Sequence, residues 1–240
     1  MKLDILAIGA HPDDVELGCS GTLAKEIHQG KSVGILDLTR GELGTRGSAE
    51  IRDKESTAAA KILNIKVREN LSFSDVFFIN DKNHQIEIIK IIRKYRPEVI
   101  FCNAVDDRHI DHPKASELVS ASCFLSGLKK INTKLDGSND LQQEWRPKFI
   151  YHYLQWKNIS PDICVDISDF MTIKLKAVMA YKSQFFKEGL SEKNTPISTK
   201  NFIDSVEYRA RDLGRLSGVD YAEGFTVERF PLVNSIFDLK

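Results

Sequence analysis

The sequence lacks an excess of charge of either sign. Its 240 residues include 34 Lys and Arg and 34 Asp and Glu, so the formal net charge is zero. Proteins that bind nucleic acid or an anionic membrane surface usually carry a basic excess that shows in this balance. We therefore expect no nucleic-acid or membrane partner, and a small molecule as the substrate.

Long apolar runs and paired cysteines are also missing. No stretch approaches the ~18 apolar residues that a membrane span requires. The opening run, residues 1–10, is shorter than a secretory signal and is followed closely by two aspartates. The cysteines form no CxxC pair, and we expect structural thiols at Cys19, Cys102, Cys123 and Cys164. These absences predict a cytoplasmic protein.

Strand-like apolar runs alternate with helical patterns over residues 1–126. Hydrophobic residues make up 42% of the chain and charged residues 28%, as in ordinary globular domains. The patterns predict strands at 3–10, 32–39, 67–73 and 98–104, and helices at 15–29, 50–63, 86–95 and from Pro113 towards Phe124. This alternation predicts an α/β fold: a Rossmann-like, doubly wound and mostly parallel sheet.

The rest of the chain predicts a C-terminal cap on that sheet. A polar loop is expected at 132–144, strands at 149–154 and 163–167, a helix at 170–186, a loop at 187–200 and a charged helix to residue 216. There is no internal repeat. We therefore expect one domain, 1–240, in which a Rossmann-like core (about 1–126) is joined by a segment (about 127–240) that completes the site.

Two clusters of His and Asp follow the first and the fourth predicted strands. The first is His11-Pro12-Asp13-Asp14, and the second is Asp106-Asp107-Arg108-His109-Ile110-Asp111-His112. In the common doubly wound order 3-2-1-4 these two strands are neighbours, and ligands bind beyond their carboxyl ends. Residues about a hundred positions apart are therefore predicted to meet in one crevice.

The residue types in these clusters predict a divalent-metal site. Imidazole and carboxylate are ligands of Zn²⁺, and a catalytic zinc keeps three protein ligands and an open position for water. His11 and Asp14 lie three positions apart across a strand-to-helix turn, so both can face one point. His112 supplies a third ligand of matching type. Because these ligand types also accept Fe²⁺, Co²⁺ or Mn²⁺, the pattern leaves the metal open.

The remaining members of the clusters suggest acid–base chemistry. Asp13 is expected to point away from the metal, where it can act as a base on the activated water. His109 is left over, and Asp111 is close enough in sequence to orient it or to hold its proton. An aspartate pair after a strand can also simply cap a helix, and a histidine at a helix start can be solvated. Two such clusters on neighbouring strands favour a catalytic site.

A loop with several glycines, residues 39–47, follows the second predicted strand. Its glycines allow close approach to a ligand, but it has neither the GxGxxG pattern nor a place after the first strand, so we reject a dinucleotide site.

The motifs resemble those of a known enzyme family. AHPDD at 10–14 and HIDH at 109–112 are similar to the zinc-dependent N-deacetylases of the PIG-L/LmbE-like family, which remove acetyl groups from substrates containing N-acetylglucosamine. TRG at 45–47 and RDKE at 52–55 look like further family elements. In the C-terminal half, FIYHY at 149–153, CVDIS at 164–168, YKSQF at 181–185, TP at 195–196 and YAEGF at 221–225 resemble the bacillithiol-pathway branch, which deacetylates N-acetylglucosaminyl L-malate.

This resemblance implies roles for the clustered residues. His11, Asp14 and His112 would be the zinc ligands, Asp13 the general base and His109 the oxyanion or acid partner. Relatives are commonly hexamers, so the resemblance also implies a homo-oligomer.

The resemblance also bears on substrate binding. It places Arg52 and Arg146 near the substrate, and Arg108 in the second cluster is a further candidate for the malate carboxylates. One departure concerns a tyrosine that the branch is expected to carry after Thr195-Pro196, where this chain has Phe202. Any role of that tyrosine at the oxyanion is therefore in doubt here.

The sequence thus predicts hydrolysis of an acetamide by a metal-activated water. One alternative is a metal-dependent phosphoesterase with two ions about 3.5–4 Å apart, although few carboxylates would remain for a second ion. Another is a non-catalytic module that binds carbohydrate or metal, in which Asp13 would have no role. A deacetylase of another N-acetylglucosamine conjugate is also open.

Overall fold

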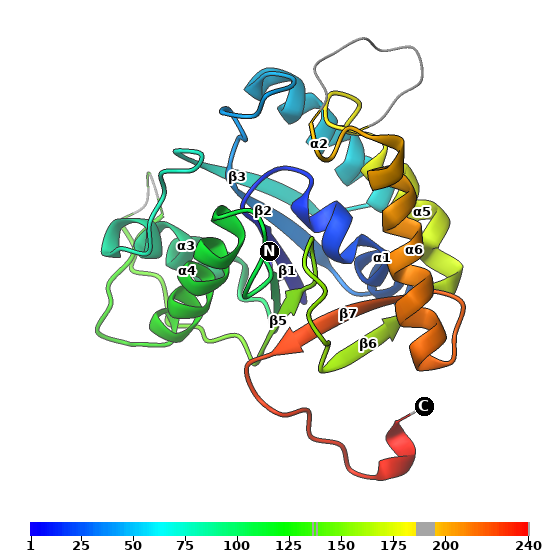
Figure 1. The fold of residues 1–240 in the computed structure, drawn as a ribbon. Coiled ribbons are helices and arrows are strands. Elements are labelled where there is room, and N and C mark those ends of the chain that lie inside the picture. The colour runs from blue at the N-terminus through cyan, green and yellow to red at the C-terminus, as the bar shows by residue number, and fades with distance from the viewer. Residues whose placement is uncertain (136, 138, 186–194, 240) are drawn as a thin grey trace.

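The computed structural model describes residues 1–135, 137, 139–185 and 195–239. Within them, one sheet of seven strands has the order β3-β2-β1-β4-β5-β7-β6 (Figure 1). The strands are β1 (Ile5–Gly9), β2 (Val33–Thr39), β3 (Val67–Phe73), β4 (Val99–Cys102), β5 (Phe149–Tyr153), β6 (Ile163–Asp166) and β7 (Ala222–Val227). The helices are α1 (Asp14–His28), α2 (Ala49–Leu63), α3 (Lys82–Tyr95), α4 (Asp111–Ser126), α5 (Met171–Val178) and α6 (Lys200–Ser217), with short 3₁₀ turns η1 (Ser168–Phe170) and η2 (Ile236–Asp238).

The predicted strand order 3-2-1-4 is confirmed. β1 runs parallel to both of its neighbours, so Ile5 pairs with Val33 of β2 and with Val99 of β4. The carboxyl ends of β1 and β4 therefore lie side by side. The chain segments that follow them, with their His and Asp clusters, leave the sheet at the same edge.

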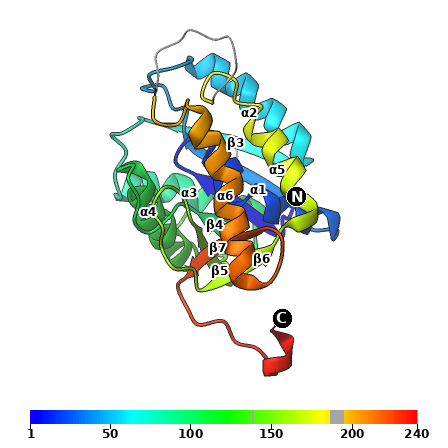
Figure 2. The same cartoon turned by 45° about the vertical axis from the view of Figure 1, so that its right-hand side comes forward.

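Alternate residues of β1 supply the two apolar cores. Leu6 and Ile8 face one side of the sheet and pack with buried residues of α3 and α4, such as Ile88 and Leu118. Ile5 and Ala7 face the other side and pack with α1. Figure 1 and Figure 2 show α3 and α4 on one face of the sheet and α1, α2, α5 and α6 on the other. Cover on both faces explains why every residue of β1 and β2 is buried.

Helix α1 packs unusually close to the sheet. A Cβ at Gly18 would overlap the ring of Tyr153 in β5, so glycine is needed for this approach. The hydroxyl of Tyr153 donates to the Ile8 carbonyl of β1 at 3.0 Å. The contact fixes the beginning of α1, and with it Asp14, against the end of the sheet.

The C-terminal segment extends the same sheet. β5 runs parallel to β4, whereas β7 pairs antiparallel with both β5 and β6. The sequence analysis predicted no strand at 222–227, and this was wrong. A strand with one buried face alternates apolar and polar residues, but Glu223 and Gly224 interrupt that pattern here, and both are buried.

The helix predicted at 170–186 is shorter than expected. It begins with η1, continues as α5 and ends at Val178. After it the chain turns, because Ser183 donates through its backbone N–H and its hydroxyl to the Glu55 carboxylate, both at 2.7 Å. Residue 186 lies outside the described residues.

No helix in the described part of the chain is both long and apolar enough to cross a membrane. The four cysteines are free, and Cys19, Cys102 and Cys123 are buried, as expected for structural thiols.

Candidate active site

A cavity of about 670 Å³ opens at the carboxyl edge of the sheet. It is lined by residues that follow β1, β2, β3, β4 and β5, and by residues of α6. The loop after β2 contributes Leu43 and Arg46, as its glycines suggested. We call this cavity the cleft.

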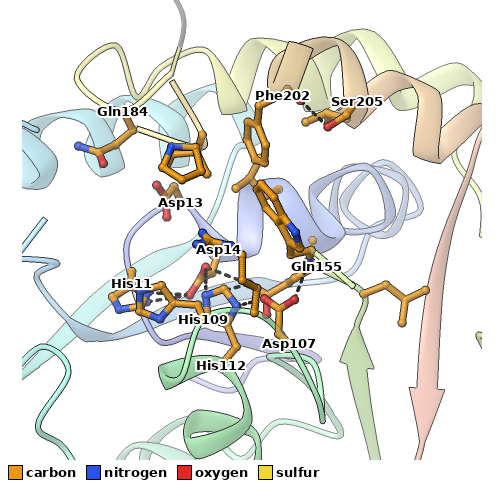
Figure 3. Close-up of a pocket in the computed structure, with 18 of the residues that line it drawn as sticks. His11, Asp13, Asp14, Asp107, His109, His112, Gln155, Gln184, Phe202 and Ser205 are labelled. Carbon is orange, nitrogen blue, oxygen red and sulfur yellow. Dashed lines mark hydrogen bonds and ion pairs between the residues drawn. The ribbon is translucent and has the colours of Figure 1, made fainter. Parts of the chain in front are cut away.

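The three predicted metal ligands meet in the cleft around one carboxylate. Asp14 Oδ2 lies 3.4 Å from His11 Nδ1, and Asp14 Oδ1 lies 3.1 Å from His112 Nε2. Figure 3 shows His11, His109 and His112 gathered beside Asp14. The two sequence clusters therefore meet as predicted.

Further carboxylates hold the outer nitrogens of both histidines. His11 Nε2 lies 3.1 Å from Asp75 Oδ1 and 3.2 Å from Asp111 Oδ2, while His112 Nδ1 is hydrogen-bonded to Asp107. A carboxylate that accepts a hydrogen bond from the N–H of one ring nitrogen leaves the lone pair on the other nitrogen, where it can bind a metal. In both rings the other nitrogen faces Asp14, and that of His112 also lies 3.3 Å from Gln155 Nε2.

Asp111 does not have the role that the sequence suggested. Its fully buried carboxylate contacts His11, accepts from the Val76 N–H at 3.0 Å and pairs with Lys114 at 2.8 Å. The prediction that it orients His109 through its side chain is wrong, because nearness in sequence does not set the direction of a side chain. Instead, the backbone N–H of Asp111 donates to His109 Nδ1 at 3.3 Å. This bond places the proton of a neutral His109 on Nε2.

Two amide side chains that the sequence analysis did not single out hold Asp14. Asn103, just after β4, donates to Asp14 Oδ2 at 3.0 Å, and Gln155, just after β5, donates to Oδ1 at 3.0 Å. The His11 N–H also donates to Oδ2 at 2.9 Å. A search for polar residues directly after each strand of the parallel sheet would have found both amides.

The electrostatics of this cluster favour a cation. Burial lowers the pKa of His112, but the carboxylates of Asp14 and Asp107 outweigh it and raise that pKa to about 9. Burial raises the pKa of Asp14, but His112 and His11 hold it well below its usual range. A site that binds protons this strongly on its imidazoles suits a divalent ion in their place.

Among the residues that the structure describes, two overlapping groups of side chains could hold an ion: His11 with His109 and His112, and His11 with Asp75 and Asp111. The first group faces the cleft, together with Asp14. In the second, Asp111 is fully buried and does not line the cleft. The donor set on the cleft side therefore fits a metal that substrate can reach.

Asp13 is turned towards a different partner. Its φ of 121° is rare for a residue other than glycine, and such backbone strain is concentrated at functional sites. Its Oδ2 lies 3.0 Å from Arg52 Nη2, and Arg52 also donates to the Pro12 carbonyl. Burial outweighs the lowering effect of Arg52 and raises the pKa of Asp13 to about 7. A carboxyl group with that pKa exchanges a proton readily near neutral pH.

The three predicted arginines have different positions. Arg52 lines the cleft but is engaged by Asp13 and Pro12. Arg108 lines the cleft with its guanidinium carbon 4.4 Å from the centre of the Trp156 ring. The structure does not bring Arg146 to the cleft, because it donates to the Phe124 carbonyl at 2.8 Å and lies over the Phe124 ring.

Phe202 forms part of an aromatic wall. Its ring is nearly parallel to that of Trp156, with centres 5.7 Å apart, and to that of Phe185, with centres 6.0 Å apart. Figure 3 shows Phe202 across the cleft from the histidines. Without a hydroxyl it cannot donate a hydrogen bond there.

Comparison with known proteins decides the family. Residues 6–123 match the family model PIG-L, described as GlcNAc-PI de-N-acetylase. The diacetylchitobiose deacetylase of Thermococcus kodakarensis is 31% identical over 230 residues, which cover 92% of this chain and 81% of the relative. This chain belongs to the PIG-L deacetylase family.

A solved structure shows the same fold, and a more distant relative has a different activity in its name. The conserved protein TT1542 from Thermus thermophilus superposes with a TM-score of 0.85 and 36% identity, covering 98% of both chains. The 4-oxalmesaconate hydratase of Pseudomonas putida is 24% identical over 236 residues, covering 91% of this chain and 86% of the relative. The predicted α/β fold of a PIG-L deacetylase is confirmed.

Proposed function

We propose that this protein is a metal-dependent N-deacetylase that hydrolyses the acetamide of an N-acetylglucosamine conjugate to the free amine and acetate. One observation carries the proposal. A metal-binding face made by His11, Asp14 and His112 lies in the same cleft as a strained, buried carboxyl group, Asp13, and a further imidazole, His109. A module that only binds sugar has no need of the last two.

The metal would be held by His11, Asp14 and His112, with Asp75, Asp111 and Asp107 behind the two rings. When bound, a divalent ion supplies Lewis acidity that activates water and polarises the acetyl carbonyl. Zn²⁺ suits this donor set, and Fe²⁺ is accepted by the same ligand types.

The side chains of this chain carry the proton transfers. Asp13 accepts the proton of the attacking water at its carboxylate, and Arg52 keeps that carboxylate in place. His109, with its proton on Nε2, donates a hydrogen bond to the acetyl oxygen as negative charge develops there. The proton on Asp13 then passes to the departing amine, so that acetic acid and a neutral amine leave, and the acid gives its proton to solvent as acetate.

The conjugate that we propose is N-acetylglucosaminyl L-malate, the substrate of the bacillithiol branch. The C-terminal motifs that resemble this branch support it, among them FIYHY at 149–153 and YAEGF at 221–225. The relative from Thermococcus kodakarensis favours a second substrate, diacetylchitobiose, at 31% identity. The two substrates differ in charge, since malate brings two carboxylates and the disaccharide none.

An assay of acetate and amine release tests the proposal. The purified protein, loaded with Zn²⁺ or Fe²⁺, is incubated with N-acetylglucosaminyl malate, diacetylchitobiose and N-acetylglucosamine. We expect equal amounts of acetate and amine, with the highest kcat/KM on the malate conjugate. A hydratase like the Pseudomonas putida relative would release neither, and turnover of 4-oxalmesaconate with no amine release would overturn the proposal.

A further inference from the structure

We propose that Arg209, together with Arg108 at the same tryptophan, binds the carboxylates of the aglycone and so selects conjugates that carry negative charge. The inference rests on the proposed function and deepens it. Arg209 was not singled out by the sequence analysis, where it is one of several charged residues on a surface helix. The structure places it in the wall of the cleft.

Arg209 differs from the neighbouring arginines of α6 in its partners. Arg211 pairs with Glu207, and Arg215 pairs with Asp212 at 2.8 Å. Arg209 instead donates to the backbone carbonyl of Trp156 at 2.6 Å, and it forms no ion pair with a carboxylate among the described residues. Burial lowers its pKa, and the charge of Asp107 only partly opposes this. A partly buried cation without its own anion gains from an anionic ligand.

Trp156 brings the second arginine to the same place. The Arg108 guanidinium lies 4.4 Å over its ring, while Arg209 holds its carbonyl. The acidic neighbours of Arg108 are engaged elsewhere: Asp106 pairs with Lys157 at 2.7 Å, and Asp107 bonds to His112. The guanidinium of Arg108 is therefore also without an ion-pair partner among the described residues.

The cleft thus contains two groups of charged side chains. One is the cluster of carboxylates and histidines that suits a metal and the acetamide. The other is Arg108 and Arg209, which both contact Trp156, and the Trp156 ring stacks with that of Phe202. A sugar ring can lie against aromatic faces, and a planar guanidinium binds a carboxylate through two N–H donors. A conjugate with an acetamide at one end and carboxylates at the other matches this arrangement.

The experiment compares two substrates that share the acetamide but differ in charge. The metal-loaded protein and its Arg209→Gln variant are assayed on N-acetylglucosaminyl malate and on uncharged methyl N-acetylglucosaminide. We expect kcat/KM on the malate conjugate to fall about ten- to a hundredfold, mainly through KM, because a charge-assisted contact is lost. The loss on the methyl glycoside should be a few-fold at most. Arg209→Lys should restore much of the difference.

A matched control and an inhibition assay separate a binding role from a structural one. Arg215→Gln removes an exposed arginine from the same helix and should change neither substrate. Free L-malate should inhibit turnover of the methyl glycoside in the wild type and far less in Arg209→Gln. Equal losses on both substrates in Arg209→Gln would show that Arg209 only positions Trp156, and unchanged kinetics would show no role; either result overturns the inference. A wild-type protein inactive on both substrates would instead overturn the proposed function.

Discussion

The guanidinium of Arg52 lies 3.0 Å from the carboxylate of Asp13, and both side chains are buried in the wall of the cleft. Arg52 was predicted to bind substrate, but it already has two partners within the protein. Arg52 holds the carboxylate of Asp13, a residue whose backbone is strained. We therefore expect Arg52 to affect catalysis through Asp13. Replacing Arg52 should therefore change the kinetics in a different way from replacing Arg108 or Arg209.

Replacing Asp13 tests the base. Asp13→Asn should keep the metal and lower kcat about 10²- to 10⁴-fold, because the amide cannot accept a proton. Metal content by elemental analysis and steady-state kinetics check the two halves of this expectation. Loss of the metal from Asp13→Asn would mean that Asp13 and Asp14 exchange roles.

Replacing Arg52 tests its positioning role. Arg52→Gln should lower kcat on charged and uncharged substrates alike, with little change in the ratio of their kcat/KM values. Arg209→Gln should change that ratio, so the two variants form a contrasting pair. If Arg52→Gln instead acted on the malate conjugate alone, Arg52 would be a substrate contact after all.

Removing the metal should abolish activity and lower thermal stability together. A ligand that binds only the folded chain raises its unfolding temperature, so Zn²⁺ added back to chelated protein should restore both. His112→Ala should lose most of this stabilisation because one of three predicted ligands is missing. Full metal occupancy and full stabilisation in His112→Ala would exclude it from the ligand set.

A buried ion pair in the wall of the cleft should be important for stability. Lys174 Nζ lies 2.6 Å from Glu223 Oε1, and Glu223 also accepts from the backbone N–H groups of Gly21 and Thr22 in α1. Lys174→Met leaves the Glu223 charge buried without its partner, which should lower the free energy of unfolding by about 3–5 kcal/mol.

Urea denaturation measures this loss. Lys200→Met, which removes the exposed pair with Asp204, is the control and should have no measurable effect. Equal stability of Lys174→Met and the wild type would mean that the pair between Lys174 and Glu223 does not stabilise the fold.

Gly41 should be intolerant of substitution. Its φ is +63°, and a Cβ there would collide with the Arg52 guanidinium. Gly41→Ala should therefore reduce kcat in the same way as Arg52→Gln, while the metal stays bound. Normal turnover in Gly41→Ala would show that the position of Arg52 matters little.

The first four strands, and the meeting of His11, Asp14 and His112, could be predicted because they depend on local patterns. Apolar runs and helical periodicity identify β1 to β4, and the handedness of crossovers then places His11 near His112. No long-range contact has to be known for this step.

The parts that were missed depend on contacts distant in sequence. β7 contains Glu223 because that carboxylate binds amides of α1 some two hundred residues away, so the strand has no simple apolar pattern. α5 ends early because Ser183 bonds to Glu55. The carboxylate of Asp111 contacts His11 and not its sequence neighbour His109, and only the fold brings Asp111 and His11 together.

The place of β7 between β5 and β6 has a consequence for the order of folding. β6 is synthesised well before β7, yet β7 is its sheet neighbour among the described residues. An emerging chain can therefore form β1 to β5, with both clusters of His and Asp, while β6 still has no strand to pair with. Pairings between distant segments form late because closing the intervening loop costs entropy. The last strand to be made thus completes the sheet, and the incomplete chain already carries the side chains that we propose as metal ligands.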